Sequence, residues 1–373
     1  MKIRSASVIR CPPRWLLLRL ESSDGEVGWG EAIGDLHEEV EPALKAMCDR
    51  VSGTDITGIE RITQEMHKGR FWRDGPVLNT AISALEMALW DLRGKQVGAP
   101  VHQLLGGPVR DKVSVYRNLW GRNPEEFAAS GKAALDEGLE MVKVSPAGPT
   151  STTPSDTELQ GILDTVMAVR HAIGDAKLAI DLHGRLTPAA SRRLLPLLEP
   201  FDLSFVEEPC LPDGSVHQQI PLATGERLLS KRQFADHLFP SPVVAVIQPD
   251  LSLVGGIRAG VEIGAMCEAA QVALAPHCPY GPIQLAASLQ VAAASPAHAF
   301  QEFQSLGGAA GGANWAFNLL ATPFVVEDGM VEVPNGPGLG IDVQEHLIEE
   351  HMDAWNPHPP TLWHHPDGSH AEW

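Results

Sequence analysis

The sequence predicts an α/β protein in which a parallel β/α barrel follows a smaller α+β domain. The chain has 373 residues, which exceeds one small domain and suits a large barrel plus a second unit. From about residue 110, short apolar runs alternate with helical patterns, and we count eight such runs. This alternation implies parallel strands, and eight of them indicate a closed barrel.

The first part of the chain has a different pattern. Residues 1–20 and 25–31 predict two strands, with residues 23–26 as the turn between them. Helical periodicity follows over residues 38–50, 58–69 and 77–95. Gly and Pro residues then interrupt the pattern, so we expect a capping domain over residues 1–110.

The barrel is expected over residues 111–324, and residues 325–373 form a C-terminal segment. The predicted strands of the barrel are Lys112–Tyr116, Glu140–Ser145, Lys177–Leu182, Leu203–Glu208, Pro221–Glu226, Val243–Pro249, Val272–His277 and Ala299–Phe303. The helices expected between them are Pro124–Glu137, Asp156–Ile173, Pro188–Leu198, Lys231–Leu238, Ile257–Ala270 and Gln284–Ser295. A doubly wound open sheet is the alternative, but no GxGxxG or P-loop motif follows an early strand.

Composition excludes several classes of function. The formal net charge of −19 argues against nucleic acid and anionic membranes as partners. No apolar run is long enough to span a membrane, and no signal sequence opens the chain, so we expect a cytoplasmic protein. The five cysteines are scattered without a CxxC motif, which indicates neither a disulfide framework nor a zinc site.

Polar side chains close six consecutive predicted strands, where barrel enzymes carry their chemistry. One such residue means little, since a lone Asp-x-His is usually an ordinary turn and a lone His after a strand is usually only hydrogen-bonded. Six consecutive strands that end in such residues do predict a functional site. Carboxylates aimed into one barrel mouth repel one another unless something neutralises them. The residues are Asp181 with His183, Glu207, Glu226, Asp250, His277 and Glu302.

Two groups within this set predict chemistry. Asp181, Glu207 and Glu226 offer carboxylate oxygens on adjacent strands, which suits a hard cation such as Mg²⁺, whereas zinc would prefer the histidines. Asp250 and His277 come from neighbouring strands. A carboxylate bonded to an imidazole fixes its tautomer and raises its basicity, as a general base requires.

These motifs resemble the enolase superfamily and its mandelate racemase subgroup over nearly the whole chain. The matching segments are Pro12–Trp15, Val27–Glu31, Ala88–Lys95, Leu104–Gly107, Asp181–Arg185, Val206–Pro209, Ala223–Arg227, Gln248–Ser252 and Leu274–Pro279. The ending Asp367–Trp373 resembles the branch that dehydrates aldonic acids such as D-galactonate. The resemblance implies a TIM-type (β/α)7β barrel, with the capping domain completed by the C-terminal tail.

The resemblance also implies roles for residues. One Mg²⁺ per subunit would bind Asp181, Glu207 and Glu226. His277, paired with Asp250, would remove the proton next to the substrate carboxylate, and His183 would protonate the departing 3-hydroxyl. Glu302 would donate a hydrogen bond to the developing enolate, with a pKa raised by a carboxyl near Glu207. The product would be a 2-keto-3-deoxy acid, and the family suggests a homo-oligomer.

The second barrel strand ends in Lys143-Val144-Ser145. Racemases of the subgroup carry a basic Lys where Ser145 stands, so the serine favours one-sided dehydration over racemisation. Lys143 is a candidate for binding the substrate carboxylate, although a Lys lining a solvated barrel mouth is an equal alternative.

Some segments depart from the family pattern. Only 19 positions separate Glu207 from Glu226, so we expect a shortened or missing helix between them. The segments expected to cap the pocket, Ile33–Glu39, Pro146–Pro154 and Leu306–Trp315, are also unusual, and such segments select among sugar-acid stereoisomers. A cycloisomerase or epimerase of the same subgroup, and a non-catalytic paralogue with a retained metal site, therefore stay open as alternatives.

Overall fold

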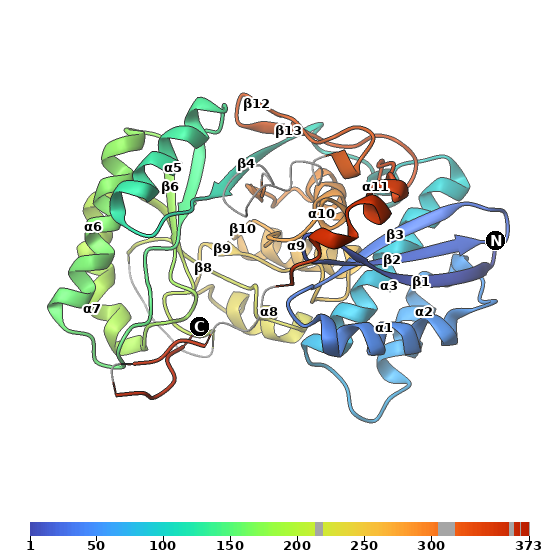
Figure 1. Ribbon diagram of the computed structural model, residues 1–373, viewed down its shortest axis with the longest axis horizontal. Coiled ribbons are helices and arrows are strands. Elements are labelled where there is room, and N and C mark those ends of the chain that lie inside the picture. The colour runs from blue at the N-terminus through green and yellow to red at the C-terminus, as the bar shows by residue number, and fades with distance from the viewer. Residues whose placement is uncertain (213–218, 305–317, 358–361, 366, 373) are drawn as a thin grey trace.

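A computed structural model describes residues 1–212, 219–304, 318–357, 362–365 and 367–372. An antiparallel sheet with its helices lies beside a barrel of parallel strands, and Figure 1 shows the two units at opposite ends of the long axis. Among the described residues, no helix has the length and apolar character needed to cross a bilayer.

The N-terminal sheet has three strands, β1 (Ile3–Cys11), β2 (Trp15–Ser22) and β3 (Val27–Ala32), in the order β1-β2-β3. The expectation of one strand over residues 1–20 was wrong, because the chain reverses so that Cys11 pairs with Trp15. Pro12 and Pro13 stand in the reversal, and proline has no N–H to give to a ladder. The predicted turn over residues 23–26 does join the next two strands.

Three helices pack with this sheet: α1 (His37–Val51), α2 (Ile59–Lys68) and α3 (Pro76–Val97). A short 3-10 turn, η1 (Ile56–Gly58), precedes α2. α3 lies so close to β3 that a Cβ on Gly30 would sit 1.9 Å from the Ala84 carbonyl oxygen. Glycine at this position therefore lets the buried helix approach the strand.

The eight predicted barrel strands are confirmed. They are β4 (Lys112–Asn118), β5 (Met141–Val144), β6 (Lys177–Asp181), β7 (Leu203–Glu207), β8 (Leu222–Thr224), β9 (Val246–Ile247), β10 (Ala273–Leu274) and β11 (Gln301–Glu302). Neighbours from β4 to β10 pair in parallel, and β11 pairs in parallel with β4. Backbone hydrogen bonds of Leu274 with Ala297 and Ala299 close the ring, so the open-sheet alternative is excluded.

The helices between the strands also match the prediction. They are α5 (Pro124–Asp136), α6 (Asp156–Ile173), α7 (Pro188–Leu198), α8 (Lys231–Leu238), α9 (Ile257–Ala270) and α10 (Pro282–Ala294). Ser155 and Ser230 form capping boxes that fix the starts of α6 and α8. Between β7 and β8 the described residues hold no helix, although residues 213–218 lie outside the description.

Smaller elements complete the fold. They are α4 (Val101–Leu104), η2 (Glu199–Phe201), β12 (Val326–Glu327), β13 (Met330–Glu332), α11 (Glu345–Glu350) and η4 (Met352–Ala354). β13 pairs antiparallel with β4 at the edge of the barrel. Farther on, the Asn356 N–H donates to the Pro13 carbonyl oxygen at 2.8 Å. Part of the C-terminal segment thus returns to the N-terminal sheet. The domain limits expected from the sequence, near residues 110 and 324, stay a prediction.

Buried carboxylates join the two units. Glu31 of β3 accepts the N–H groups of Gly281 and Gln284 at the start of α10, at 2.6 and 2.9 Å. Glu86 of α3 accepts the N–H groups of Ile257 and Arg258 at the start of α9, at 2.7 and 2.9 Å. The first turn of a helix has unsatisfied N–H donors, so each carboxylate caps a barrel helix from the other unit.

Candidate active site

Three carboxylates meet at the carboxyl ends of adjacent parallel strands. Asp181 closes β6 and pairs in register with Glu207, which closes β7. Glu226 follows β8, the next strand around the barrel. Each side chain offers one oxygen, and these oxygens lie within 4.8 Å of one another. The strand order therefore brings together the three residues that the sequence singled out as a metal site.

Lys143 of β5 points into this cluster. Its Nζ lies 2.6 Å from Glu207, 3.3 Å from Asp181 and 3.5 Å from Glu302. Burial alone would lower the pKa of Lys143, but Glu207 and Glu302 raise it well above the ordinary value. Lys143 is therefore a buried ammonium ion among carboxylates, and the alternative of a Lys in a solvated mouth does not match its 1% exposure.

The carboxylates differ in proton affinity. Burial and the charge of Asp181 raise the pKa of Glu207 well above its ordinary value. Burial would do the same to Asp181, but His183 and Lys143 hold the pKa of Asp181 below the ordinary value. Crowded carboxylates in a dry site cannot all ionise unless positive charge is present, so the cluster has a strong demand for a cation.

The predicted dyad of His277 and Asp250 is present. His277 Nδ1 lies 2.9 Å from Asp250 Oδ2, and the other Asp250 oxygen accepts 2.7 Å bonds from Gln284 Nε2 and the Ser252 N–H. On the other side of the ring, His277 Nε2 lies 3.1 Å from Glu226. Burial would lower the pKa of His277, but Glu302, Glu226 and Asp250 raise it to about 10.

His183 contacts another carboxylate of the cluster, Asp181. Its Nε2 lies 3.1 Å from Asp181 Oδ2, and its N–H donates to Asp181 Oδ1 at 2.8 Å. The backbone of His183 is left-handed, with φ of 49°, which non-glycine residues seldom adopt. Burial lowers the pKa of His183 although Asp181 and Glu226 act against it.

Glu302 of β11 departs from the expectation for its charge. Burial would raise its pKa, but Lys143 and His277 hold the pKa of Glu302 below the ordinary value. Its oxygens accept the Asn118 amide at 2.6 Å and the Cys278 N–H at 2.7 Å. An ionised carboxylate that accepts hydrogen bonds cannot donate one, so this arrangement does not match the donor role expected of Glu302.

The residues present fit a hard divalent cation. The donor set consists of carboxylate oxygens, which Mg²⁺ prefers. Glu207 Oε1 is fully buried and has no hydrogen-bond partner among the described residues. A buried carboxylate oxygen without a partner is costly, and a cation at the cluster would satisfy it.

Contacts connect all eight residues predicted for the site, and the structure adds four that sequence reasoning missed. Gln284 and Asn118 hold Asp250 and Glu302, whereas Glu208 and Arg227 form a 2.7 Å ion pair beside His183. Glu208 and Arg227 each stand next to a predicted metal ligand in motifs that the sequence analysis quoted. Their adjacency was the available signal, although the partner of each could be seen only in three dimensions.

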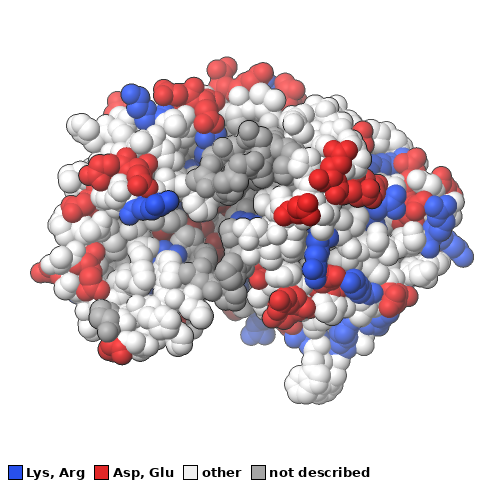
Figure 2. Space-filling model, viewed as in Figure 1, with Lys and Arg blue, Asp and Glu red and all other residues white. Residues whose placement is uncertain are grey.

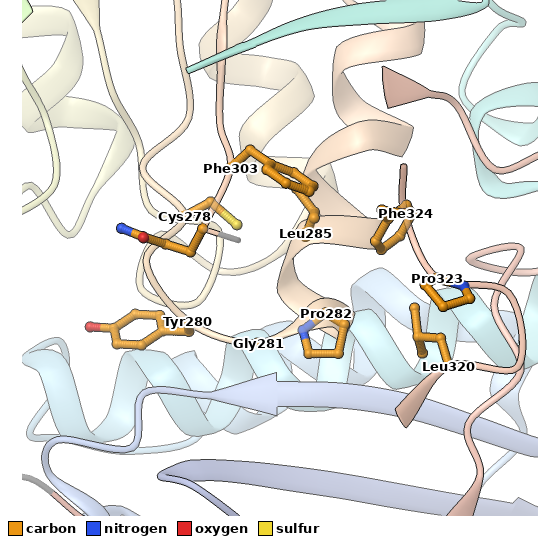
Figure 3. A pocket seen from close by; sticks show the side chains of 10 residues that line it. Cys278, Tyr280, Gly281, Pro282, Leu285, Phe303, Leu320, Pro323 and Phe324 are labelled. Atoms are coloured by element: carbon orange, nitrogen blue, oxygen red, sulfur yellow. The ribbon is translucent and has the colours of Figure 1, made fainter. Parts of the chain in front are cut away.

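The space beside the dyad is apolar. A cavity of about 40 Å³ is lined by Cys278, Tyr280, Leu285, Phe303 and Phe324 among others, and Figure 3 shows these side chains around it. Arg14 of the N-terminal unit lies over the Tyr280 ring and pairs with Asp35 at 2.9 Å. The acidic segment Ile33–Glu39 thus reaches this side of the site, and Figure 2 shows acidic side chains spread over the visible face of the molecule. All of Leu306–Trp315 lies outside the described residues.

Comparison with known proteins agrees with this geometry. Residues 126–347 match the enolase C-terminal domain-like family, and residues 6–106 match the N-terminal domain of mandelate racemase and muconate lactonizing enzymes. The chain is 37% identical to a D-galactonate dehydratase from Ralstonia pickettii and 36% identical to one from Cronobacter sakazakii, with all of each chain covered.

Solved structures give the same result. A mandelate racemase/muconate lactonizing enzyme from a Sulfitobacter species is 29% identical, with a TM-score of 0.88 and both chains fully covered. An enolase from Agrobacterium radiobacter, with sodium and L-malate bound, is 28% identical, with a TM-score of 0.89 and the same full coverage.

Proposed function

This chain belongs to the enolase superfamily, in its mandelate racemase subgroup, and we propose that it is a Mg²⁺-dependent sugar-acid dehydratase. Full-length similarity to D-galactonate dehydratases makes it a carbon–oxygen lyase. The proposed reaction removes the C2 proton and the 3-hydroxyl of an aldonic acid such as D-galactonate. The product is a 2-keto-3-deoxy acid.

One observation carries this proposal: two imidazoles contact different members of one carboxylate cluster. His277 lies 3.1 Å from Glu226, and His183 lies 3.1 Å from Asp181. Dehydration needs a base for the C2 proton and an acid for the leaving hydroxyl, and the two must reach the substrate from separate positions. A substrate carboxylate held at the cluster would have one imidazole on each flank.

Asp181, Glu207 and Glu226 are the proposed ligands of one Mg²⁺ per subunit. When bound, Mg²⁺ supplies positive charge against the substrate carboxylate, whose α-proton is otherwise too weakly acidic to remove. Lys143 is the proposed second source of positive charge, because its Nζ is already directed at Glu207 and Glu302.

His277 is the proposed base. Asp250 fixes the ring through Nδ1, which leaves Nε2 as the atom that takes the C2 proton. The carboxylates that raise the pKa of His277 to about 10 include the proposed metal ligand Glu226. Neutralising that carboxylate lowers the pKa of His277, so a filled site favours the neutral ring that a base needs.

His183 is the proposed acid for the 3-hydroxyl. Burial lowers the pKa of His183, which makes its imidazolium form a readier proton donor. Ser145, after β5, carries no basic group that could take or return a proton at C2. One base and one acid suit an elimination. Glu302 remains a candidate for contact with the substrate carboxylate, together with the hydrogen-bond donors that surround Glu302.

The test is a screen of aldonic acids, D-galactonate included, for 2-keto product in the presence of Mg²⁺. We expect one or a few stereoisomers to react. His183→Asn should abolish product formation, whereas full turnover by this variant would favour the cycloisomerase or epimerase alternative. Absence of activity with every acid in the screen would favour a non-catalytic paralogue and refute the proposal.

A further inference from the structure

The turns after β6 and β7 are held by one arginine. His183 and Glu208 both have left-handed backbones, with φ of 49° and 38°, and they stand on neighbouring strand ends. Arg227 Nη1 donates to the His183 carbonyl oxygen at 3.0 Å and to Glu208 Oε2 at 2.7 Å. Residues in such sparsely populated conformations persist only where their surroundings hold them.

Further contacts fix this ion pair. Thr224 of β8 donates its hydroxyl to the second Glu208 oxygen at 2.9 Å, and the Gly184 N–H donates to the Glu208 carbonyl oxygen at 2.8 Å. Glu208 is completely buried, whereas Arg227 is 31% exposed at the rim. The nearest approach of Arg227 to the proposed metal ligand Glu226 is longer, at 3.8 Å. The pair therefore acts chiefly on the His183 turn.

We propose that Arg227 and Glu208 are positioning residues for His183, so that they serve the departure of the 3-hydroxyl and leave removal of the C2 proton unaffected. This inference rests on the function proposed for His183. An arginine is suited to the task because its planar guanidinium bonds a carboxylate and a carbonyl oxygen in fixed directions, which lysine cannot reproduce.

Two reactions of Arg227→Gln separate this role from a merely structural one. Dehydration is followed as 2-keto product, and C2 proton removal is followed as deuterium exchange into a 3-deoxy aldonic acid, which has no hydroxyl to lose. We expect kcat for dehydration to fall about 100-fold. Exchange should stay within about threefold of the wild type, and Arg227→Lys should lie between the two for dehydration.

The matched control is Arg193→Gln, because Arg193 likewise bonds both a carbonyl oxygen and a carboxylate. Its guanidinium donates to the Pro154 carbonyl oxygen and to the Asp156 carboxylate. Arg193→Gln should change neither reaction. Equal loss of dehydration and exchange in Arg227→Gln, or unchanged dehydration, would overturn the positioning role. A wild-type protein that neither dehydrates nor exchanges any acid fails at the level of the proposed function instead.

Discussion

Replacing Glu31 by glutamine is expected to change protein stability in a pH-dependent way. Glu31 is completely buried and accepts the N–H groups of Gly281 and Gln284 at the start of α10. Burial raises the pKa of Glu31 from 4.5 to about 7, although the N–H donors act against the rise. Glutamine keeps the shape of the side chain but does not titrate, so the variant isolates this effect.

The magnitude follows from the pKa values. Because the folded-state pKa is the higher one, the contribution of Glu31 to stability is fully present below pH 4.5 and is lost as the pH rises through 7. At about 1.36 kcal/mol per pKa unit, the wild type loses about 2.5 kcal/mol between pH 5 and pH 8. Glu31→Gln avoids this loss, but its amide oxygen replaces two acceptors, at a cost of about 1–2 kcal/mol.

Urea unfolding at pH 5 and pH 8 measures the difference. Glu31→Gln should be mildly destabilised at pH 5 and at least as stable as the wild type at pH 8, with an unchanged m-value. Glu158→Gln is the control, because bonds from Ser155 and Ser151 lower the pKa of the exposed Glu158 to about 2. The contribution of Glu158 is lost only as the pH falls below 4.5, so this variant should differ from the wild type equally at pH 5 and pH 8. A difference between Glu31→Gln and wild type that is the same at both pH values, or that grows less favourable with pH, would refute the reasoning.

Other predictions concern the site and the core. Asp250→Asn should lower kcat by about 10²–10⁴, with loss of C2 exchange as well as dehydration, because the ring of His277 loses its carboxylate partner. Excess chelator should abolish turnover and added Mg²⁺ should restore it, so complete activity in chelator would contradict the metal assignment. Burial lowers the pKa of His298 to about 3, so its contribution to stability is present above pH 6.5 and is lost as the pH falls towards 3. His298→Gln should therefore lose about 2.5 kcal/mol less than the wild type between pH 7 and pH 4.5 in urea unfolding.

Much of the barrel could be predicted because each strand and helix depends on local patterns. α6, α7, α8 and α9 have the predicted limits, since capping residues and apolar periodicity mark a helix within its own sequence. The reversal at Pro12 and Pro13 was missed because apolar character continues through it, and only the pairing of Cys11 with Trp15 reveals two strands.

The proposed metal ligands were found from sequence for a similar reason. Strands of a parallel barrel end at one rim, so a carboxylate at a strand end has a known position before any contact is seen. Charge is different, because it depends on every neighbour. Glu302 was expected to hold a proton, but Lys143 and His277 keep its pKa below the ordinary value.

The sequence by itself therefore determined the class of fold, the order of the strands and the residues at the barrel mouth, since each follows from short-range pattern and chain direction. Only the tertiary structure decided how those residues act on one another. Lys143 reaches Glu207 across 64 positions of sequence, and Glu31 caps a helix 250 positions away. Such contacts set proton affinity and local geometry, and they form only when distant segments are packed together.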